Sequence, residues 1–243
     1  MFDQTVRNRL HAAGIWAYRP AVRIVLTPRH RRARLRWTRA HARWTRAQWS
    51  RIVFSDESRF CLQQGDGRVR VWRKKGERYA NCCIREQDRH RGGSVMVWGA
   101  IDTEEKSDLV FVDGNLTAAQ YVEQIINPEV VPLFARRDNL VYMHDNARPH
   151  AARLTNNHLA NMGIPVLPWP SKSPDLNPIE HLWDELDRRV RNRAHPPTNL
   201  QELRAALLAE WQAIPRGKWR RFIYSMRRRC QAVIRSEGGH TEY

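Results

Sequence analysis

The chain has 243 residues, of which 42% are hydrophobic, so it is long and apolar enough for one large domain with a buried core. No apolar run approaches the length of a membrane span, so no membrane-spanning helix is expected. Forty-two Lys and Arg against 25 Asp and Glu give a net charge of +17, which favours nucleic acid as partner over a ribosomal-type, heparin-binding or merely soluble surface.

The first 50 residues contain twelve arginines and a single acid, Asp3. A short basic helix is predicted over residues 5–13, where Gly14 ends it. Residues 18–28 contain two prolines and little periodicity, which indicates an extended linker. Thr27 and Pro28 are typical of a helix start, and this helix should reach about Arg43. Thr45 is then predicted to cap a short turn through Trp49.

The hydrophobic period changes to two at Arg51, which predicts a strand over residues 52–62. Gly65-Asp66-Gly67 is typical of a hairpin turn, and Val69 and Val71 should begin the returning strand. Two further strands are predicted over residues 94–101 and 109–112.

Helices dominate the second half of the chain. One is predicted over residues 117–134, capped by Thr117 and interrupted near Pro128, and another over 151–162, ended by Gly163. Short strands are expected at 140–144 and 165–167. Three helices, at 178–193, 200–214 and 218–235, should close the chain. The segment from Arg216 to Arg235 carries eight basic residues and no acid. This order predicts an α/β fold, a mixed sheet with helices on both faces.

The four cysteines, Cys61, Cys82, Cys83 and Cys230, contain no Cys-x-x-Cys pair. We interpret them as reduced thiols of an intracellular protein, and no signal peptide is visible.

Asp56 shares its predicted strand face with Phe54 and Phe60. A carboxylate on such a face is costly unless it is paired, hydrogen-bonded or bound to a metal ion. The alternative is an aspartate near the strand end that pairs with Arg59. Glu57 points to the opposite face, and we interpret it as a surface or pairing residue.

Asp145 follows the strand predicted at 140–144, and strand ends are where ligand sites collect in open α/β sheets. The alternative is a turn or helix cap made by the aspartate side chain. Three histidines, His144, His150 and His158, raise the question of zinc. The spacing of His150 and His158 suits a helical site poorly and no cysteine is near, so zinc is disfavoured.

Glu180 occupies the third position of a helix for which Asn177 is a good cap and Pro178 the first residue. The alternative is a capping box, in which Glu180 serves only the helix end. Asp184 lies on the same helix face at i+4 and is a rival for any role given to Glu180.

Two carboxylates from neighbouring strands and one from a helix can together hold two divalent ions, which activate an attacking oxygen and stabilise a leaving one. Hard oxygen ligands favour Mg²⁺, with Mn²⁺ as a substitute.

At these residues the sequence resembles the Tc/mariner superfamily of transposases. The matching stretches are WSRIVFSDESRF around Asp56, VYMHDNARPHAA around Asp145 and WPSKSPDLNPIEHLWDEL around Glu180. Thirty-four residues separate Asp145 from Glu180, which is the spacing of the Tc-like branch, whereas mariner-like members carry a final Asp. VWGAI and LTPRHRRARLRW are further family-like segments.

The resemblance implies an RNase H-like fold, a catalytic triad of Asp56, Asp145 and Glu180, and two magnesium ions held by that triad. It implies action in the nucleus as a DNA transposase, a metal-dependent endonuclease that excises an element and inserts it at TA dinucleotides. Double-stranded DNA, as transposon ends and TA target, and a second copy of the chain are the expected partners. The expected DNA-binding residues are Arg7, Arg9, Arg29, Arg31, Arg32, Arg34 and Arg36.

Family members begin with two helix-turn-helix modules, and this chain starts too late to hold both. We expect residues 1–15 to be a remnant of the second module, residues 16–50 a basic linker and helix, and residues 51–243 the catalytic domain with its C-terminal helices. The main rival is an inactive or host-retained copy that binds DNA without cutting it. A nuclease or resolvase of the same fold and a non-enzymatic basic DNA-binding module are the others.

Overall fold

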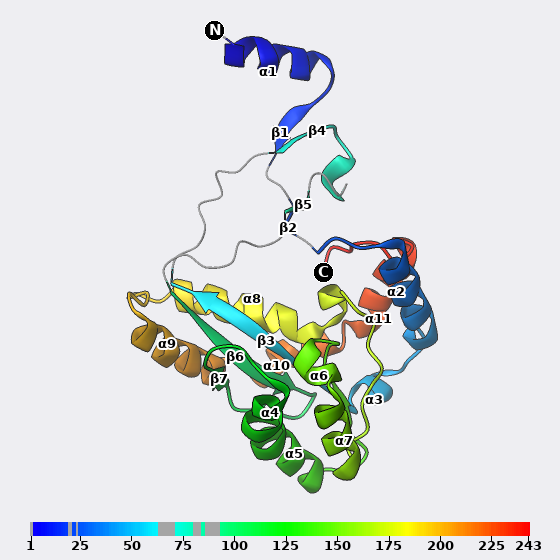
Figure 1. The fold of residues 1–243 in the computed structure, drawn as a ribbon, viewed down its shortest axis with the longest axis vertical. Coiled ribbons are helices and arrows are strands. Elements are labelled where there is room, and N and C mark those ends of the chain that lie inside the picture. The colour runs from blue at the N-terminus through cyan, green and yellow to red at the C-terminus, as the bar shows by residue number, and fades with distance from the viewer. Residues whose placement is uncertain (1, 19–20, 23, 63–70, 80–83, 86–92) are drawn as a thin grey trace.

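A four-stranded mixed sheet lies at the centre of the molecule, in the order β7-β6-β3-β8 (Figure 1). The computed structural model describes residues 2–18, 21–22, 24–62, 71–79, 84–85 and 93–243. The strands of the sheet are β3 (Ile52–Cys61), β6 (Ser94–Ile101), β7 (Val110–Val112) and β8 (Val141–Met143). β6 runs antiparallel to β3 and β7, whereas β8 runs parallel to β3. The mixed sheet expected from the sequence is therefore present.

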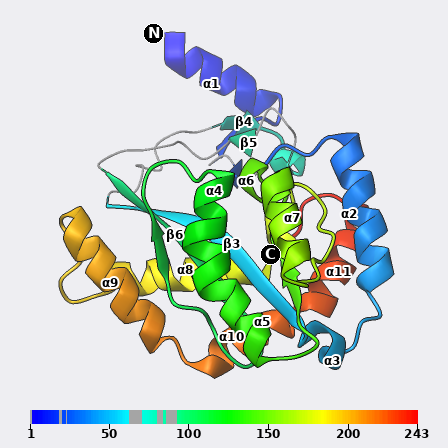
Figure 2. The same ribbon diagram turned by 60° about the horizontal axis from the view of Figure 1, so that its bottom comes forward.

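Helices cover both faces of this sheet, as Figures 1 and 2 show. One face carries α4 (Ala118–Tyr121), a π-helix (Val122–Val130), α5 (Val131–Arg136) and α7 (Arg153–Asn161). The other carries α8 (Pro178–Arg191), α9 (Leu200–Ala213), α10 (Arg216–Ile223) and α11 (Met226–Arg235). Successive residues of β3 separate into two cores, since Val53 packs with the first set of helices and Phe54 with the second.

The helix α8 begins where its sequence predicts. Asn177 caps it by accepting a hydrogen bond from the backbone N–H of Ile179, and Pro178 is its first residue. Its apolar stripe is fully buried against the sheet, so burial of that stripe sets the orientation of the whole helix. The stripe consists of Ile179, Leu182, Trp183, Leu186 and Val190.

The N-terminal elements are α1 (Phe2–Ala12), β1 (Trp16–Tyr18), β2 (Ala21–Val22), α2 (Pro28–His41) and α3 (Arg46–Trp49). Thr27 caps α2 and Thr45 caps α3, as their sequences predict. β1 pairs antiparallel with β4 (Val71–Arg73), and β2 pairs with β5 (Ile84–Arg85). None of the described helices is long and apolar enough to cross a membrane.

Several predicted elements need correction. Val71 pairs with Tyr18 of β1 and not with the strand 52–62, whose antiparallel neighbour is β6. The predicted turn at 65–67 and Val69 lie outside the described residues. The segment 117–134 stays helical throughout, but its α-helix gives way around Pro128 to a π-helix, which accommodates a residue that has no N–H to donate.

Three other boundaries differ from the prediction. The segment from Arg148 forms α6 (Arg148–Ala151) and then α7, which begins after the extended residue Ala152. The last predicted helix is two helices, α10 and α11, separated at Tyr224 and Ser225. Residues 165–167 form a single bridge from Val166 to Tyr142 and no strand.

A buried ion pair joins α2 to the segment before α8, and hydrogen bonds tie both to the C-terminal residues. Arg34 of α2 donates two hydrogen bonds of 2.6 Å to the carboxylate of Asp175 and others to the carbonyl oxygens of Gly238 and Gly239. Thr241 donates to the same carboxylate at 2.9 Å. We call these five residues the clasp. Because Asp175 lies in the short 3-10 helix Pro174–Leu176 just before α8, the clasp holds the segment that leads into Glu180.

Candidate active site

Asp56, Asp145 and Glu180 come from three different elements that meet where β8 ends beside the middle of β3. Asp56 lies in the middle of β3, Asp145 follows the end of the neighbouring parallel strand β8, and Glu180 lies in the first turn of α8. Asn177 joins them, since its side-chain amide donates to the carbonyl oxygen of Ser55 at 3.2 Å and to Asp56 Oδ2 at 3.4 Å. The start of α8 is thereby fixed beside β3.

Asp56 and Glu180 form a half-buried acid pair whose side chains are in contact. Burial, followed by repulsion from Glu180, Glu57 and Asp145, raises the pKa of Asp56 well above its ordinary value. Burial also raises the pKa of Glu180 to about 7, although the hydrogen bond with Asp56 opposes this. Repulsion of this kind requires the acids to be close together. A bound cation would stabilise carboxylates in such an arrangement.

Asp145 is held differently. Its Oδ1 accepts hydrogen bonds of 2.7 Å from the backbone N–H of Ala147 and from His150 Nδ1. Burial alone would raise the pKa of Asp145, but these hydrogen bonds have the larger combined effect and lower it. The other ring nitrogen of His150 lies 3.2 Å from Glu57 Oε1. Burial opposes the charge on His150, yet its bonds to Asp145 and Glu57 raise its pKa to about 10.

The donor set suits a hard divalent cation, because it consists of clustered carboxylates whose mutual repulsion a cation would relieve. In the described part of the chain, however, no three His, Cys, Asp or Glu side chains are already arranged around a point where they could hold a metal ion. Binding of a cation would therefore require small movements of these side chains.

The structure also bears on the other roles that the sequence suggested for these acids, as a turn, a helix cap or an ion pair. Asp145 does form the turn expected of an aspartate, through its bond to Ala147. Glu180 makes its hydrogen bond with Asp56 across the helix start. Arg59 is exposed and donates to Ser94 Oγ at 3.1 Å. Asp184, the rival of Glu180, is exposed on α8.

Sequence reasoning missed the link made by His150. It considered this residue only as a zinc ligand and treated Glu57 as a surface or pairing residue. The structure supports the pairing interpretation of Glu57, with His150 as its partner. The signal was present in the motif, because a histidine five positions after Asp145 can fold back onto it through one tight turn.

Arg34 is the clear correction among the expected DNA-binding residues. Its side chain is 1% exposed and its guanidinium is taken up by Asp175, so it cannot contact DNA. The other six side chains are exposed, on α1 and α2: Arg7, Arg9, Arg29, Arg31, Arg32 and Arg36.

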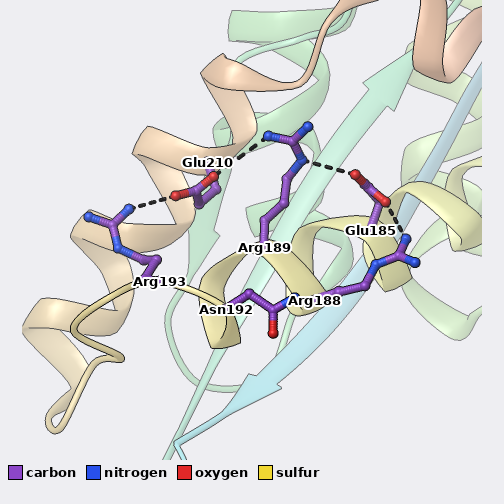
Figure 3. Close-up of a pocket in the computed structure, with 6 residues that line it drawn as sticks. All are labelled: Glu185, Arg188, Arg189, Asn192, Arg193 and Glu210. Atoms are coloured by element: carbon purple, nitrogen blue, oxygen red, sulfur yellow. Dashed lines mark hydrogen bonds and ion pairs between the residues drawn. The ribbon is translucent and has the colours of Figure 1, made fainter.

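A second charged hollow lies at the far end of α8 from Glu180 (Figure 3). Arg189 bridges Glu185 and Glu210 at 3.0 and 3.8 Å, and Arg193 bonds to Glu210 at 2.8 Å. The ion pairs join α8 to α9. The acids of this hollow are therefore neutralised by arginines, unlike the carboxylates of the acid cluster. Its lining consists of Glu185, Arg188, Arg189, Asn192, Arg193 and Glu210.

Comparison with known proteins finds two matching family models. Residues 51–204 match a model described as DDE superfamily endonuclease, and residues 1–43 match one described as transposase. The chain is 36% identical to the Tcb1 transposase of Caenorhabditis briggsae and 36% identical to the Tc1 transposase of Caenorhabditis elegans. Each match covers 99% of this chain and 88% of the relative.

The fold is similar to that of the mariner Mos1 transposase. A Mos1 paired-end complex with left transposon end matches with a TM-score of 0.71 at 22% identity, over 98% of this chain and 71% of that one. The Mos1 catalytic domain solved with raltegravir and Mn matches with a TM-score of 0.67 at 19% identity, over 90% of this chain and all of that one. The expected RNase H-like fold is therefore confirmed.

Proposed function

Because this chain belongs to the Tc1-like branch of the Tc1/mariner transposases, within the DDE superfamily endonucleases, we propose that it cleaves DNA at transposon ends and joins the freed ends to target DNA. The target sites proposed are TA dinucleotides. The reaction is phosphoryl transfer in two steps at one site. Water first attacks a phosphodiester, and the freed 3′-hydroxyl then attacks the target.

The observation that carries this proposal is the acid cluster formed by Asp56, Asp145 and Glu180. Burial and the nearby carboxylates of Glu180 and Asp145 raise the pKa of Asp56, so the cluster is destabilised unless a positive group joins it. We propose that the three residues hold two Mg²⁺ ions, or Mn²⁺ in their place. Bound ions would supply activation of the attacking oxygen and stabilisation of the leaving oxygen.

The chain's own residues would prepare this chemistry. Asn177 keeps Asp56 and the first turn of α8 together, which sets the separation of two of the proposed ligands. The clasp fixes the segment before α8, because Arg34 and Thr241 both donate hydrogen bonds to Asp175. Such fixed positions matter because alignment of the reacting groups supplies much of the rate in phosphoryl transfer.

We propose double-stranded DNA and a second copy of the chain as partners. The related Mos1 transposase forms paired-end complexes with transposon DNA, which supports both partners. The exposed arginines of α1 and α2 would contact phosphates, with residues 1–15 as a helix-turn-helix remnant, 16–50 as a basic linker and 51–243 as the catalytic domain. A chain that acts on chromosomal DNA would work in the nucleus.

The test is strand cleavage of a DNA duplex by the purified protein with Mg²⁺. Asp145→Asn should abolish cleavage and keep the fold, because Asn retains the shape of the side chain and removes its charge. Asp184→Asn is the matched control and should be much milder, since Asp184 is exposed. Circular dichroism of both variants checks that they fold.

Cleavage at the wild-type rate by Asp145→Asn would refute the assignment. Greater damage from Asp184→Asn would move the third ligand to Asp184. If the wild-type protein binds DNA and never cuts it with either ion, the chain is a DNA-binding relative without the chemistry.

A further inference from the structure

His150 connects two carboxylates that lie on different elements. Its ring is 1% exposed, with Nδ1 at 2.7 Å from Asp145 Oδ1 and Nε2 at 3.2 Å from Glu57 Oε1. Asp145 follows β8, whereas Glu57 belongs to β3, where it directly follows Asp56. One imidazole ring therefore links the two carboxylates directly.

Packing fixes the orientation of this ring. The ring of Tyr121 lies 4.3 Å from that of His150, and the ring of His144 lies 5.3 Å away, measured between centroids. Tyr121 is itself held by a hydrogen bond of 2.8 Å to the hydroxyl of Tyr142, which accepts a bond from Ser55. A ring enclosed in this way cannot rotate without breaking both of its carboxylate contacts.

The contacts of Asp145 are one-sided. In the part of the chain that the structure describes, both hydrogen bonds to its carboxylate end on Oδ1, from Ala147 and from His150. Oδ2 is thus the oxygen left for a cation. Half of the side chain is exposed, so without His150 the bond from Ala147 would be the one hydrogen bond among the described residues that still holds this carboxylate.

We propose that His150 and Glu57 are positioning residues for the metal site, with His150 holding Asp145 in its ligand orientation and Glu57 holding His150. This inference rests on the proposed function, since it concerns the same carboxylates. Neither residue touches DNA or the reacting atoms in this scheme. Hydrogen-bond partners behind a metal ligand commonly contribute 10–100-fold to metal affinity, so an effect of that size is expected.

The experiment measures Mn²⁺ binding to the full chain without DNA, by calorimetry and by the electron paramagnetic resonance signal of free Mn²⁺. His150→Ala should weaken binding by about 10–100-fold. His150→Asn should recover part of the loss, because the Asn amide nitrogen can take the place of Nδ1 and still donate to Asp145. His158→Ala is the control, since this half-buried histidine bonds to Asn127 and not to the acids, and it should bind Mn²⁺ as the wild type does.

Glu57→Gln provides the readout that a merely structural role would not change. If Glu57 acts through His150, this substitution weakens Mn²⁺ binding in the wild-type background and adds nothing in the His150→Ala background. Equal effects in both backgrounds would overturn the inference. Thermal unfolding identifies any variant that fails to fold, and His150→Asn and Glu57→Gln still decide the question if His150→Ala does not fold.

Two failures can be told apart. If the wild type binds Mn²⁺, Asp145→Asn does not, and His150→Ala binds as tightly as the wild type, the positioning role is refuted and the metal site stands. If the wild type does not bind Mn²⁺ at all, the metal site of the proposed function fails, and the positioning role fails with it.

Discussion

Replacing Gly99 with alanine should disturb the acid pair from the neighbouring strand, on the face of the sheet that α8 covers. Gly99 of β6 is the register partner of Asp56, and its missing side chain lets two tryptophan rings pack directly on the strand. A Cβ atom at this position would lie 2.8 Å from Cη2 of Trp183 and 3.3 Å from two ring atoms of Trp211. Both rings are buried and stacked on each other, so neither has free space to enter.

The size of the effect follows from these distances. The Trp183 ring would have to retreat by roughly half an ångström, and overpacking of this kind costs about 1–3 kcal/mol of the free energy of unfolding. Trp183 lies on α8 three residues after Glu180, so a shift of the helix also moves the carboxylate. We expect weaker Mn²⁺ binding together with the lower stability.

Urea unfolding followed by circular dichroism measures the stability, and calorimetry measures the Mn²⁺ affinity. Gly217→Ala is the matched control, because an added Cβ there meets nothing within 4 Å and α10 should tolerate it. Gly99→Ala with the wild-type unfolding midpoint would show that Trp183 and Trp211 repack freely. The reasoning about α8 would then be wrong.

Three further outcomes are expected. Arg34→Ala leaves Asp175 buried without its charge partner, so urea unfolding should show a loss of about 3–5 kcal/mol, whereas Arg32→Ala, exposed on the same helix, should change little. Burial raises the pKa of the Cys230 thiol to about 12, so little of it is thiolate at pH 8. Iodoacetamide should therefore label Cys230 only after unfolding, and rapid labelling of this residue in the folded protein would contradict the reasoning. If about six phosphates are neutralised, DNA affinity should fall roughly a thousandfold between 50 and 200 mM salt, and a flat response in a binding titration would mean that the charge is not a DNA surface.

Local signals in the sequence located the elements that carry the acids. The alternation from Ile52 onward and the cap formed by Asn177 and Pro178 depend only on neighbouring residues, and both elements occur where they were predicted. Pairing between strands depends on distant residues, which is why Val71 was assigned to the wrong partner.

The sequence also did not show which charged residues would be buried. Arg34 stands in a run of basic residues, and composition treats every arginine in such a run alike. Only the tertiary structure shows that this one meets Asp175, which lies far along the chain. The bridge made by His150 was missed for a similar reason, since Glu57 becomes its neighbour only when β3 and β8 lie side by side.

The clasp also sets an order of events during synthesis. Arg34 and the carbonyl oxygen of Gly238 are 204 positions apart, so a growing chain exposes Arg34 and Asp175 long before their remaining partners exist. Until residues 238–241 leave the ribosome, the segment that leads into Glu180 lacks the bond from Thr241, and Arg34 lacks two of its acceptors. Domains otherwise tend to fold from the N-terminus as they emerge. The acid pair of Asp56 and Glu180 is therefore expected to be among the last parts of the molecule to reach its final geometry.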